Sequence, residues 1–155
     1  MYFHQGTPYR YSAWQPIPYL GLPATPRPLY YGNLFMAQLL QGGHKQVGLL
    51  TNTTFFTSYG IYTFGKLTDV AIINFNIYNS TSTGPREYMR VDLPQASSKS
   101  VVRRLTAPGA EVKDGITFAG ITVSAEGELS GGKLEKVEGN KQILVGASEA
   151  VLVTL

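Results

Sequence analysis

The chain of 155 residues contains no cysteine and only two histidines, His4 and His44. Without cysteine it can form no disulfide, no thiolate metal site and no cysteine nucleophile. Two histidines are also too few for a histidine-rich metal centre. We therefore expect no metal site in this chain.

Charged residues are scarce: they make up 15% of the chain, against about 25% in ordinary soluble domains. A surface so poor in charge suggests that part of it is covered by another body. The formal net charge is only +3, and the only basic doublet is Arg103-Arg104, whose side chains would point to opposite faces of a strand. We expect no nucleic-acid partner. No apolar run reaches the roughly 18 residues of a membrane span, so we expect no membrane partner either.

Two stretches imitate a phosphate-binding loop, Gly60–Lys66 and Gly127–Lys133, but each is followed by leucine where serine or threonine would bind magnesium. Each also leads into a predicted strand, whereas a phosphate cradle needs a helix N-terminus. No GxSxG motif is present. We expect no nucleotide or other cofactor and no serine-hydrolase site.

The N-terminal stretch "YFHQGTPYRYSAWQP" is rich in aromatic residues, as the wall of a sugar-binding cleft is, yet it contains no acid. The first acidic residue of the chain is Asp69. Glycoside hydrolysis needs two carboxylates about 5–9 Å apart. The later glutamates flank turns or alternate with lysines, as solvated strand edges do. We therefore predict no catalytic residue in this chain.

The local pattern divides the chain into three zones. Residues 1–28 carry six prolines and predict, after a possible short strand at the start, an ordered loop. "LYYGNLFMAQLLQGG" predicts a helix, with Pro28 in its first turn and Gly42-Gly43 as its stop. This helix is apolar around most of its circumference, which indicates burial on more than one side. Nothing before it is large enough to cover its far side.

From residue 46 onward the sequence is rich in β-branched and aromatic residues, with turn signals every 8 to 12 residues. This spacing predicts an antiparallel β-sandwich of seven or eight short strands. "DVAIINFNIYNS" is interpreted as one buried strand, and "KVEGNKQI" as a two-residue hairpin. The predicted fold is therefore mainly β, with an aromatic loop and one helix in front of the sandwich.

The aromatic zone offers four candidate binding residues. Tyr9 follows the turn Gly6-Thr7-Pro8, which can present backbone amides and one phenol to an anionic oxygen. Trp14 and Tyr11 are candidates for stacking on a sugar. The alternative for Trp14, as for the tyrosines near it, is an ordinary role in the core of a domain interface.

At this point the sequence resembles a known family. "YFHQGTPYRYSAWQP", "RPLYYGNLFMAQLL", "VRRLTAPGAEVKDGITFAG" and "GASEAVLV" are similar to the C-terminal portion of fungal glycoside hydrolase family 79 proteins, which include β-glucuronidases and, more distantly, heparanases. The resemblance implies a (β/α)₈ catalytic barrel followed by a β-sandwich. It implies that residues 1–45 are a remnant of the barrel (its last strand, a loop and its last helix) and that residues 46–155 are the sandwich.

The resemblance also implies a role for Tyr9 and the absence of two other features of the family. Tyr9, with Gly6 as backbone support, would help hold the carboxylate of a bound uronic acid, although Thr7-Pro8 departs from the family's Gly-rich turn. The two catalytic glutamates of this retaining family lie on earlier barrel strands and are missing here. The sandwich of the family often borrows a strand from the segment before the barrel, and that segment is missing too.

Three hypotheses follow. The first is a non-catalytic C-terminal β-domain fragment, whose partners are the catalytic barrel of the parent enzyme and a glycan containing uronic acid. The second is a free-standing carbohydrate-binding module that uses Trp14, Tyr9 and Tyr11. The third is a chain that complements a separate barrel chain. The sequons Asn52-Thr53-Thr54 and Asn79-Ser80-Thr81 make Asn52 and Asn79 candidate glycosylation sites of a secreted parent, although no signal peptide is visible in this chain.

Overall fold

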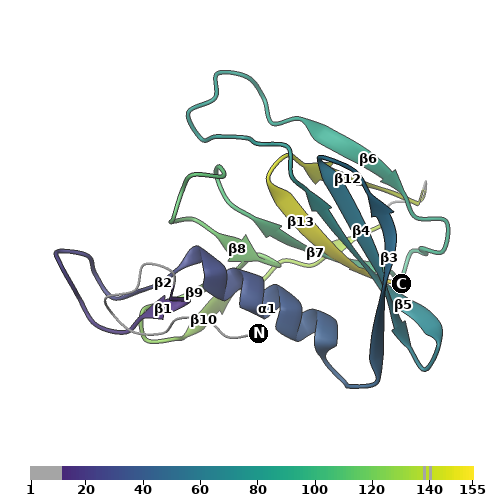
Figure 1. Ribbon diagram of the computed structural model, residues 1–155, viewed down its shortest axis with the longest axis horizontal. Coiled ribbons are helices and arrows are strands. Elements are labelled where there is room, and N and C mark those ends of the chain that lie inside the picture. The colour runs from purple at the N-terminus through teal and green to yellow at the C-terminus, as the bar shows by residue number, and fades with distance from the viewer. Residues whose placement is uncertain (1–11, 138, 140) are drawn as a thin grey trace.

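The computed structural model describes residues 12–137, 139 and 141–155 (Figure 1). The elements in chain order are β1 (Trp14–Gln15), β2 (Thr25–Pro26), α1 (Pro28–Leu40), β3 (Lys45–Asn52), β4 (Phe56–Thr63), β5 (Lys66–Asn74), β6 (Tyr88–Asp92), β7 (Val101–Thr106), β8 (Thr117–Phe118), β9 (Ile121–Val123), β10 (Leu129–Gly131), β11 (Glu135–Lys136), β12 (Gln142–Gly146) and β13 (Glu149–Thr154).

Most of these strands form one large sheet. Within the described residues it has nine strands, in the order β10-β9-β8-β7-β13-β5-β4-β3, with β11 also paired to β7. A second sheet consists of β12 and β6 alone. All the pairings are antiparallel. The predicted mainly β, antiparallel sandwich is therefore confirmed, with two sheets of very unequal width.

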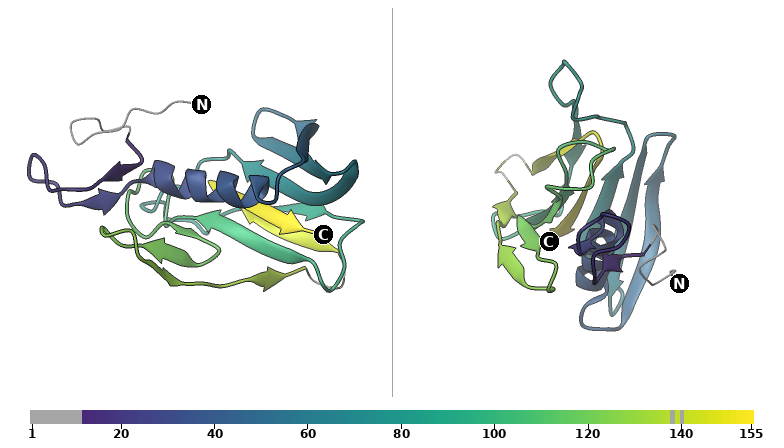
Figure 2. Two further views of the ribbon diagram at one scale, coloured as in Figure 1. Left: turned by 90° about the horizontal axis from the view of Figure 1, so that it is seen from below. Right: turned by 90° about the vertical axis from the view of Figure 1, so that its left-hand side faces the viewer.

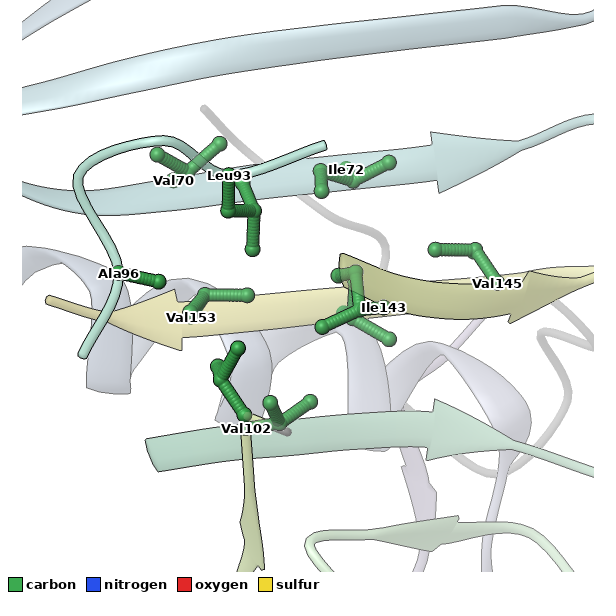
Figure 3. Close-up of a cluster of buried hydrophobic side chains, with 10 residues drawn as sticks. Val70, Ile72, Leu93, Ala96, Val102, Ile143, Val145 and Val153 are labelled. Atoms are coloured by element: carbon green, nitrogen blue, oxygen red, sulfur yellow. The ribbon is translucent and has the colours of Figure 1, made fainter. Parts of the chain in front are cut away.

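The sandwich core lies between the two sheets (Figure 3). Val151 and Val153 of β13 alternate with Leu152, so the two valines face the small sheet while the leucine faces the opposite side. Ile143 and Val145 of β12 pack against them from the small sheet. Side chains of this size each contribute about 1.5–3 kcal/mol when fully buried, so this layer is a real core and not a surface contact.

Helix α1 covers the other face of the large sheet (Figure 2). Its buried residues Tyr31, Phe35 and Leu39 recur every four positions, which places them on one side of the helix. The Phe35 ring lies 5.6 Å from that of Phe118 in β8, and the Tyr31 hydroxyl accepts a hydrogen bond of 3.1 Å from the N–H of Val123. The predicted helix is confirmed, with Pro28 in its first turn. Within the described residues, only one side of it is covered.

The proline-rich segment before α1 is more regular than the predicted loop. Strands β1 and β2 pair, and Tyr19 and Leu22 exchange backbone hydrogen bonds of 2.9 and 3.0 Å beyond them. Residues 12–27 thus form a two-stranded arm that extends past the N-terminal end of α1 (Figures 1 and 2). The amide of Gln15, buried inside the arm, donates to the carbonyls of Leu22 and Pro23. These side-chain bonds stabilise a segment whose prolines cannot donate ladder bonds.

Two local predictions are wrong. The hairpin predicted for "KVEGNKQI" does not form, because β11 pairs with β7 in the large sheet while β12 pairs with β6 in the small one. The buried strand predicted for residues 69–80 ends at Asn74. Asn74 is buried there, where its amide donates to the carbonyl of Val145 (3.1 Å) and joins the two sheets. Phe75 and Ile77, which follow the strand, are exposed.

Candidate functional site

Of the four predicted binding residues, the structure describes one. Gly6, Tyr9 and Tyr11 lie outside the described residues. Trp14 lies in β1 at the base of the arm, where its side chain is 36% exposed and its indole N–H donates to the carbonyl of Ala125 at 3.0 Å. The tryptophan therefore fastens the arm to the loop between β9 and β10, and leaves part of its ring accessible.

The base of the arm is fixed to the domain. Ser12 and Ala13 are buried, and the carbonyl of Ala13 accepts a hydrogen bond of 2.8 Å from the N–H of Arg27, at the start of α1. The guanidinium of Arg27 in turn donates to the side-chain carbonyl of Gln15. The chain directly after Tyr11 is thus held in a defined position relative to α1.

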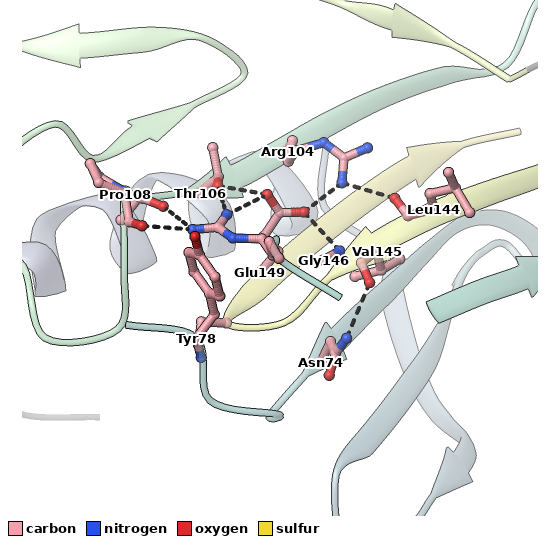
Figure 4. A network of polar contacts seen from close by, with 12 residues as sticks. Asn74, Tyr78, Arg104, Thr106, Pro108, Leu144, Val145, Gly146 and Glu149 are labelled. Atoms are coloured by element: carbon pink, nitrogen blue, oxygen red, sulfur yellow. Dashed lines mark hydrogen bonds and ion pairs between the residues drawn. The ribbon is translucent and has the colours of Figure 1, made fainter. Parts of the chain in front are cut away.

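The most concentrated group of charges lies between the two sheets, around Glu149 (Figure 4). The side chain of Glu149 is only 4% exposed, and both of its oxygens are fully engaged. One accepts from Arg86 at 2.9 Å and from the Thr106 hydroxyl at 2.7 Å. The other accepts from Arg104 at 2.8 Å and from the N–H of Gly146 at 2.9 Å. Four hydrogen-bond donors, two of them cationic guanidinium groups, therefore hold the carboxylate of Glu149 as an anion.

Both arginines also bind backbone groups. Arg86 donates to the carbonyls of Ala107 (2.6 Å) and Pro108 (3.1 Å), and its guanidinium lies 4.7 Å from the centre of the Tyr78 ring. Arg104 donates to the carbonyl of Leu144 at the free edge of β12. The network therefore joins the loop after β7, the small sheet and the start of β13.

A second carboxylate, Glu135, reaches Arg104 from the solvent side. Its oxygens accept from the guanidinium at 3.3 and 3.0 Å, and its side chain is 37% exposed. Burial alone would lower the pKa of Arg104, but Glu135 and Glu149 outweigh burial and raise that pKa. Burial alone would raise the pKa of Glu149, but the hydrogen bonds from Thr106 and Gly146 and the charge of Arg104 hold it below its usual value.

The network draws residues from two of the segments that carried the family resemblance. "RLTAPGA" supplies Arg104, Thr106 and the two carbonyls after it, and "GASEAVLV" supplies Gly146 and Glu149. Sequence reasoning missed this group, because nothing in the spacing of residues 86, 104 and 149 shows that they meet. The role that the geometry supports is structural, since a carboxylate held as an anion by two arginines cannot protonate a leaving group.

In the described part of the chain, no group of three or more His, Asp or Glu side chains converges as metal ligands would. No helix in that part is long and apolar enough to cross a membrane.

Two hollows flank the small sheet, and they differ in chemistry. On the β12 side, a cleft of about 260 Å³ is lined by Arg90, Arg104, Glu135 and Lys136 among others, and Arg104 occupies the strand edge there. On the β6 side, an apolar groove of about 380 Å³ lies between residues 91–95 and the inner face of β3, β4 and β5. Charged side chains thus occupy the β12 edge of the small sheet, whereas the β6 edge lies beside a groove that is open to an apolar partner.

A further apolar area, the α1-side surface, is defined by exposed side chains of the arm, of α1, of β3 and of the turn after β4: Ile17, Tyr19, Leu20, Leu22, Met36, Leu40, Val47, Leu49 and Phe64. Val47 and Leu49 belong to it because they pair with Ile61 and Tyr59, which pack on the side of the sheet that α1 covers. Residues 12–44 contain a single charged side chain, Arg27. A surface that faces only water carries fewer large apolar side chains and more charged ones than this.

The candidate glycosylation sites are both exposed. Asn52 is the last residue of β3, and Asn79 lies in the loop after β5. Beside Asn79, the backbone N–H and hydroxyl of Ser80 donate to Glu111 at 2.9 and 2.6 Å. Neither asparagine is hidden by the fold.

Comparison with known proteins agrees with this architecture. Residues 58–152 match the family model of the glycosyl hydrolase family 79 C-terminal beta domain. The chain is 31% identical to a beta-glucuronidase of Aspergillus niger, over 99% of this chain and 31% of that protein. It is 29% identical to a beta-glucuronidase of Neurospora crassa, over 86% of this chain and 30% of that protein.

Among solved structures, a 4-O-α-L-rhamnosyl-β-D-glucuronidase from Fusarium oxysporum 12S superposes with a TM-score of 0.70 at 28% identity. That match covers 81% of this chain and 29% of the other. The fold and these matches define the class, a β domain of a glycoside hydrolase. The chain belongs to glycosyl hydrolase family 79, and its residues 58–152 correspond to the C-terminal β domain of that family. It spans about three tenths of the length of the relatives that it matches.

Proposed function

We propose that this chain is the non-catalytic C-terminal β domain of a β-glucuronidase-like enzyme, and that it packs on a catalytic barrel. The observation that carries the proposal is the α1-side surface. Helix α1 buries Tyr31, Phe35 and Leu39 against its own sheet, while Met36 and Leu40 remain 48% and 49% exposed on a helix without a single charge. A helix apolar on both sides packs between two bodies.

The chemistry of the described residues supports a non-catalytic role. The one deeply buried carboxylate of a glutamate, that of Glu149, is neutralised by Arg86 and Arg104. A retaining glycosidase needs a protonated acid and a free nucleophilic carboxylate about 5–5.5 Å apart. The catalytic pair would therefore come from the barrel.

The finer part of the proposal concerns the uronic-acid subsite. Tyr9, supported by Gly6, would donate its phenol to the substrate carboxylate, as the family resemblance implies. The fixed arm base supports this role, because the buried Ser12 and Ala13 place the chain immediately after Tyr11. A phenol needs such anchoring to act as a selective donor.

The groove on the β6 side is the proposed seat of a strand from the segment before the barrel. The free edge of β6 and the apolar side chains of Phe56, Leu67 and Val91 along the groove suit an extended apolar segment. A strand added there would gain main-chain hydrogen bonds from the edge and side-chain contacts from the groove.

An activity assay tests the proposed function. The 155-residue chain should not hydrolyse an aryl β-glucuronide. When it is joined to the N-terminal part of the Aspergillus niger relative, Tyr9→Phe should raise KM for the glucuronide more than for the corresponding glucoside, which lacks the carboxylate. Turnover by the isolated chain, confirmed after repurification, would contradict the non-catalytic role. Equal KM changes for both substrates would contradict the role of Tyr9.

The alternative is a free-standing carbohydrate-binding module, which the partly exposed rings of Trp14 and Tyr19 (36% and 40%) favour. Calorimetric titration of the chain with glucuronoxylan fragments separates the two functions. Saturable binding that Trp14→Ala abolishes supports the module, provided that the variant keeps its melting temperature. Co-purification with a separately expressed barrel would instead support complementation between two chains.

We also propose that the parent protein is secreted and carries glycans at Asn52 and Asn79. The exposure of both asparagines supports this proposal. Expression through a yeast secretory pathway should give a product whose mass falls on endoglycosidase treatment, and Asn52→Gln and Asn79→Gln should each remove one increment. A product of unmodified mass would rule it out.

A further inference from the structure

Two exposed apolar side chains occupy backbone conformations that disfavour them. Leu20 and Phe64 both have φ near +50°, and each precedes a glycine that also has positive φ, Gly21 at +75° and Gly65 at +77°. Both pairs form the tip of a two-residue hairpin turn. Turns with two positive φ angles favour asparagine, aspartate or glycine at the first position. Leucine and phenylalanine are strained there.

Neither side chain is buried by its own domain in a way that would offset this strain. Leu20 and Phe64 are each 81% exposed, more than any other large apolar side chain in the described part of the chain. Phe64 has one aromatic neighbour, His44, whose ring stacks at 4.9 Å. Strained conformations cluster at functional sites, so a contact outside this domain is the reason to keep these two side chains.

Their turns lie beyond the two ends of α1. The arm with Leu20 at its tip leads directly into the helix, since its base is hydrogen-bonded to Arg27. Phe64 stacks on His44, four residues after the helix ends at Leu40. Both are among the exposed apolar side chains that define the α1-side surface. In that surface residues 12–44 carry one charged side chain, Arg27, and Lys66 is exposed beside the Phe64 turn. A surface with so many exposed apolar side chains fits a permanent interface.

We propose that Leu20 and Phe64 are the anchor residues of that interface, each inserted into an apolar pocket on the catalytic part of the same polypeptide. The occupant follows from length: the chain spans only 31% of a related β-glucuronidase and matches the C-terminal β domain, so most of such a protein precedes the arm. Apolar anchors in desolvated pockets carry most of the energy of an interface. This inference rests on the proposed function.

The first test uses the 155-residue chain. Leu20→Asn and Phe64→Asn each place at the turn tip a residue that tolerates positive φ, so each should raise the melting temperature by about 2–4 °C and reduce self-association. Leu134→Asn is the matched control, because Leu134 is 60% exposed without positive φ. A lower melting temperature in Leu20→Asn or Phe64→Asn would show that this domain itself holds the side chain, and would overturn the inference.

The second test uses the chain joined to the N-terminal part of the Aspergillus niger relative. In the joined protein the two substitutions should have the opposite effect: Leu20→Asn and Phe64→Asn should each lower the melting temperature. The chain has no cysteine, so single variants report accessibility. The thiols of Leu20→Cys and Phe64→Cys should react in the isolated chain and lose most of their labelling in the joined protein, whereas Leu134→Cys should react in both. Labelled peptides are identified by mass spectrometry.

The outcomes separate the two proposals. If the joined protein is stabilised but all three thiols label equally, the domain packs on the barrel through another surface, and only the anchor inference fails. If joining neither stabilises the domain nor protects any site, the proposed function fails with it. A third outcome is that the isolated chain forms a dimer, that Leu20→Asn and Phe64→Asn dissociate it, and that the thiols in the joined protein still react. This outcome would assign the surface to a second copy of the chain and overturn the inference.

Discussion

Glu149→Gln tests whether the buried charge network stabilises the fold. The substitution preserves the size of the side chain but removes its charge, and it places an amide NH₂ among four hydrogen-bond donors. Arg86 and Arg104 then lose the carboxylate that both of them contact at 2.9 and 2.8 Å. Their side chains are only 13% and 19% exposed, so water cannot replace the lost anion.

The expected loss of stability follows from this burial. Removing one partner of a buried ion pair costs about 3–5 kcal/mol. The slight exposure of both arginines places this case at the lower end, at about 3 kcal/mol. For a chain of this size, such a loss lowers the melting temperature by about 6–12 °C.

The matched control is Glu135→Gln, which removes the other carboxylate on Arg104. The Glu135 side chain is 37% exposed against 4% for Glu149. A solvated ion pair contributes about 0–1 kcal/mol, so the control should unfold close to the unsubstituted chain. Thermal and urea unfolding, followed by circular dichroism, measure both variants. Equal and small losses in the two variants would refute the argument that burial decides the strength of the network.

The stabilisation also has a defined pH dependence. The pKa of Glu149 is lower in the folded domain than in the unfolded chain, because its hydrogen bonds and Arg104 favour the anion. The stabilisation is therefore fully present above the ordinary glutamate pKa of about 4.3 and is lost as the pH falls through the lower, folded value. The difference between the unsubstituted chain and Glu149→Gln should stay constant from neutral to mildly acidic pH and shrink only below that range.

Two further substitutions test the junction of the sheets. Asn74→Ala leaves the buried carbonyl of Val145 without its 3.1 Å donor and should cost about 1–3 kcal/mol, read from the urea midpoint; an unchanged midpoint would show that the bond is dispensable. Gly146→Ala would place a Cβ 2.8 Å from Arg86 Cδ and should lower the melting temperature, whereas Gly84→Ala, with nothing within 4 Å, should not. Comparable melting temperatures in the two alanine variants would contradict the close packing of the network.

The sequence predicted the elements whose signals are local. Helix α1 begins at Pro28 and ends just before Gln41, because proline fits a first turn and the Gly42-Gly43 pair favours the positive φ angles that end a helix. These boundaries depend on φ preferences, which a short stretch of sequence contains.

The scarcity of charge in the whole chain and the helix that is apolar around most of its circumference already indicated an interface, and the structure then showed which side of α1 is left uncovered. The failed hairpin between β11 and β12 shows the limit of local signals. Turn residues favour a reversal of the chain, but here the two flanking strands pair in different sheets.

Only the tertiary structure brought Arg86, Arg104 and Glu149 together, over separations of 45 and 63 residues along the chain. Sequence alone determined that the chain has no thiol chemistry, little charge, one helix and a mainly antiparallel fold. Which carboxylate is buried, which sheet edge stays open and which hairpin tips are strained were decided by strand order. Strand order depends on the burial of side chains distant in sequence, and no local pattern encodes it.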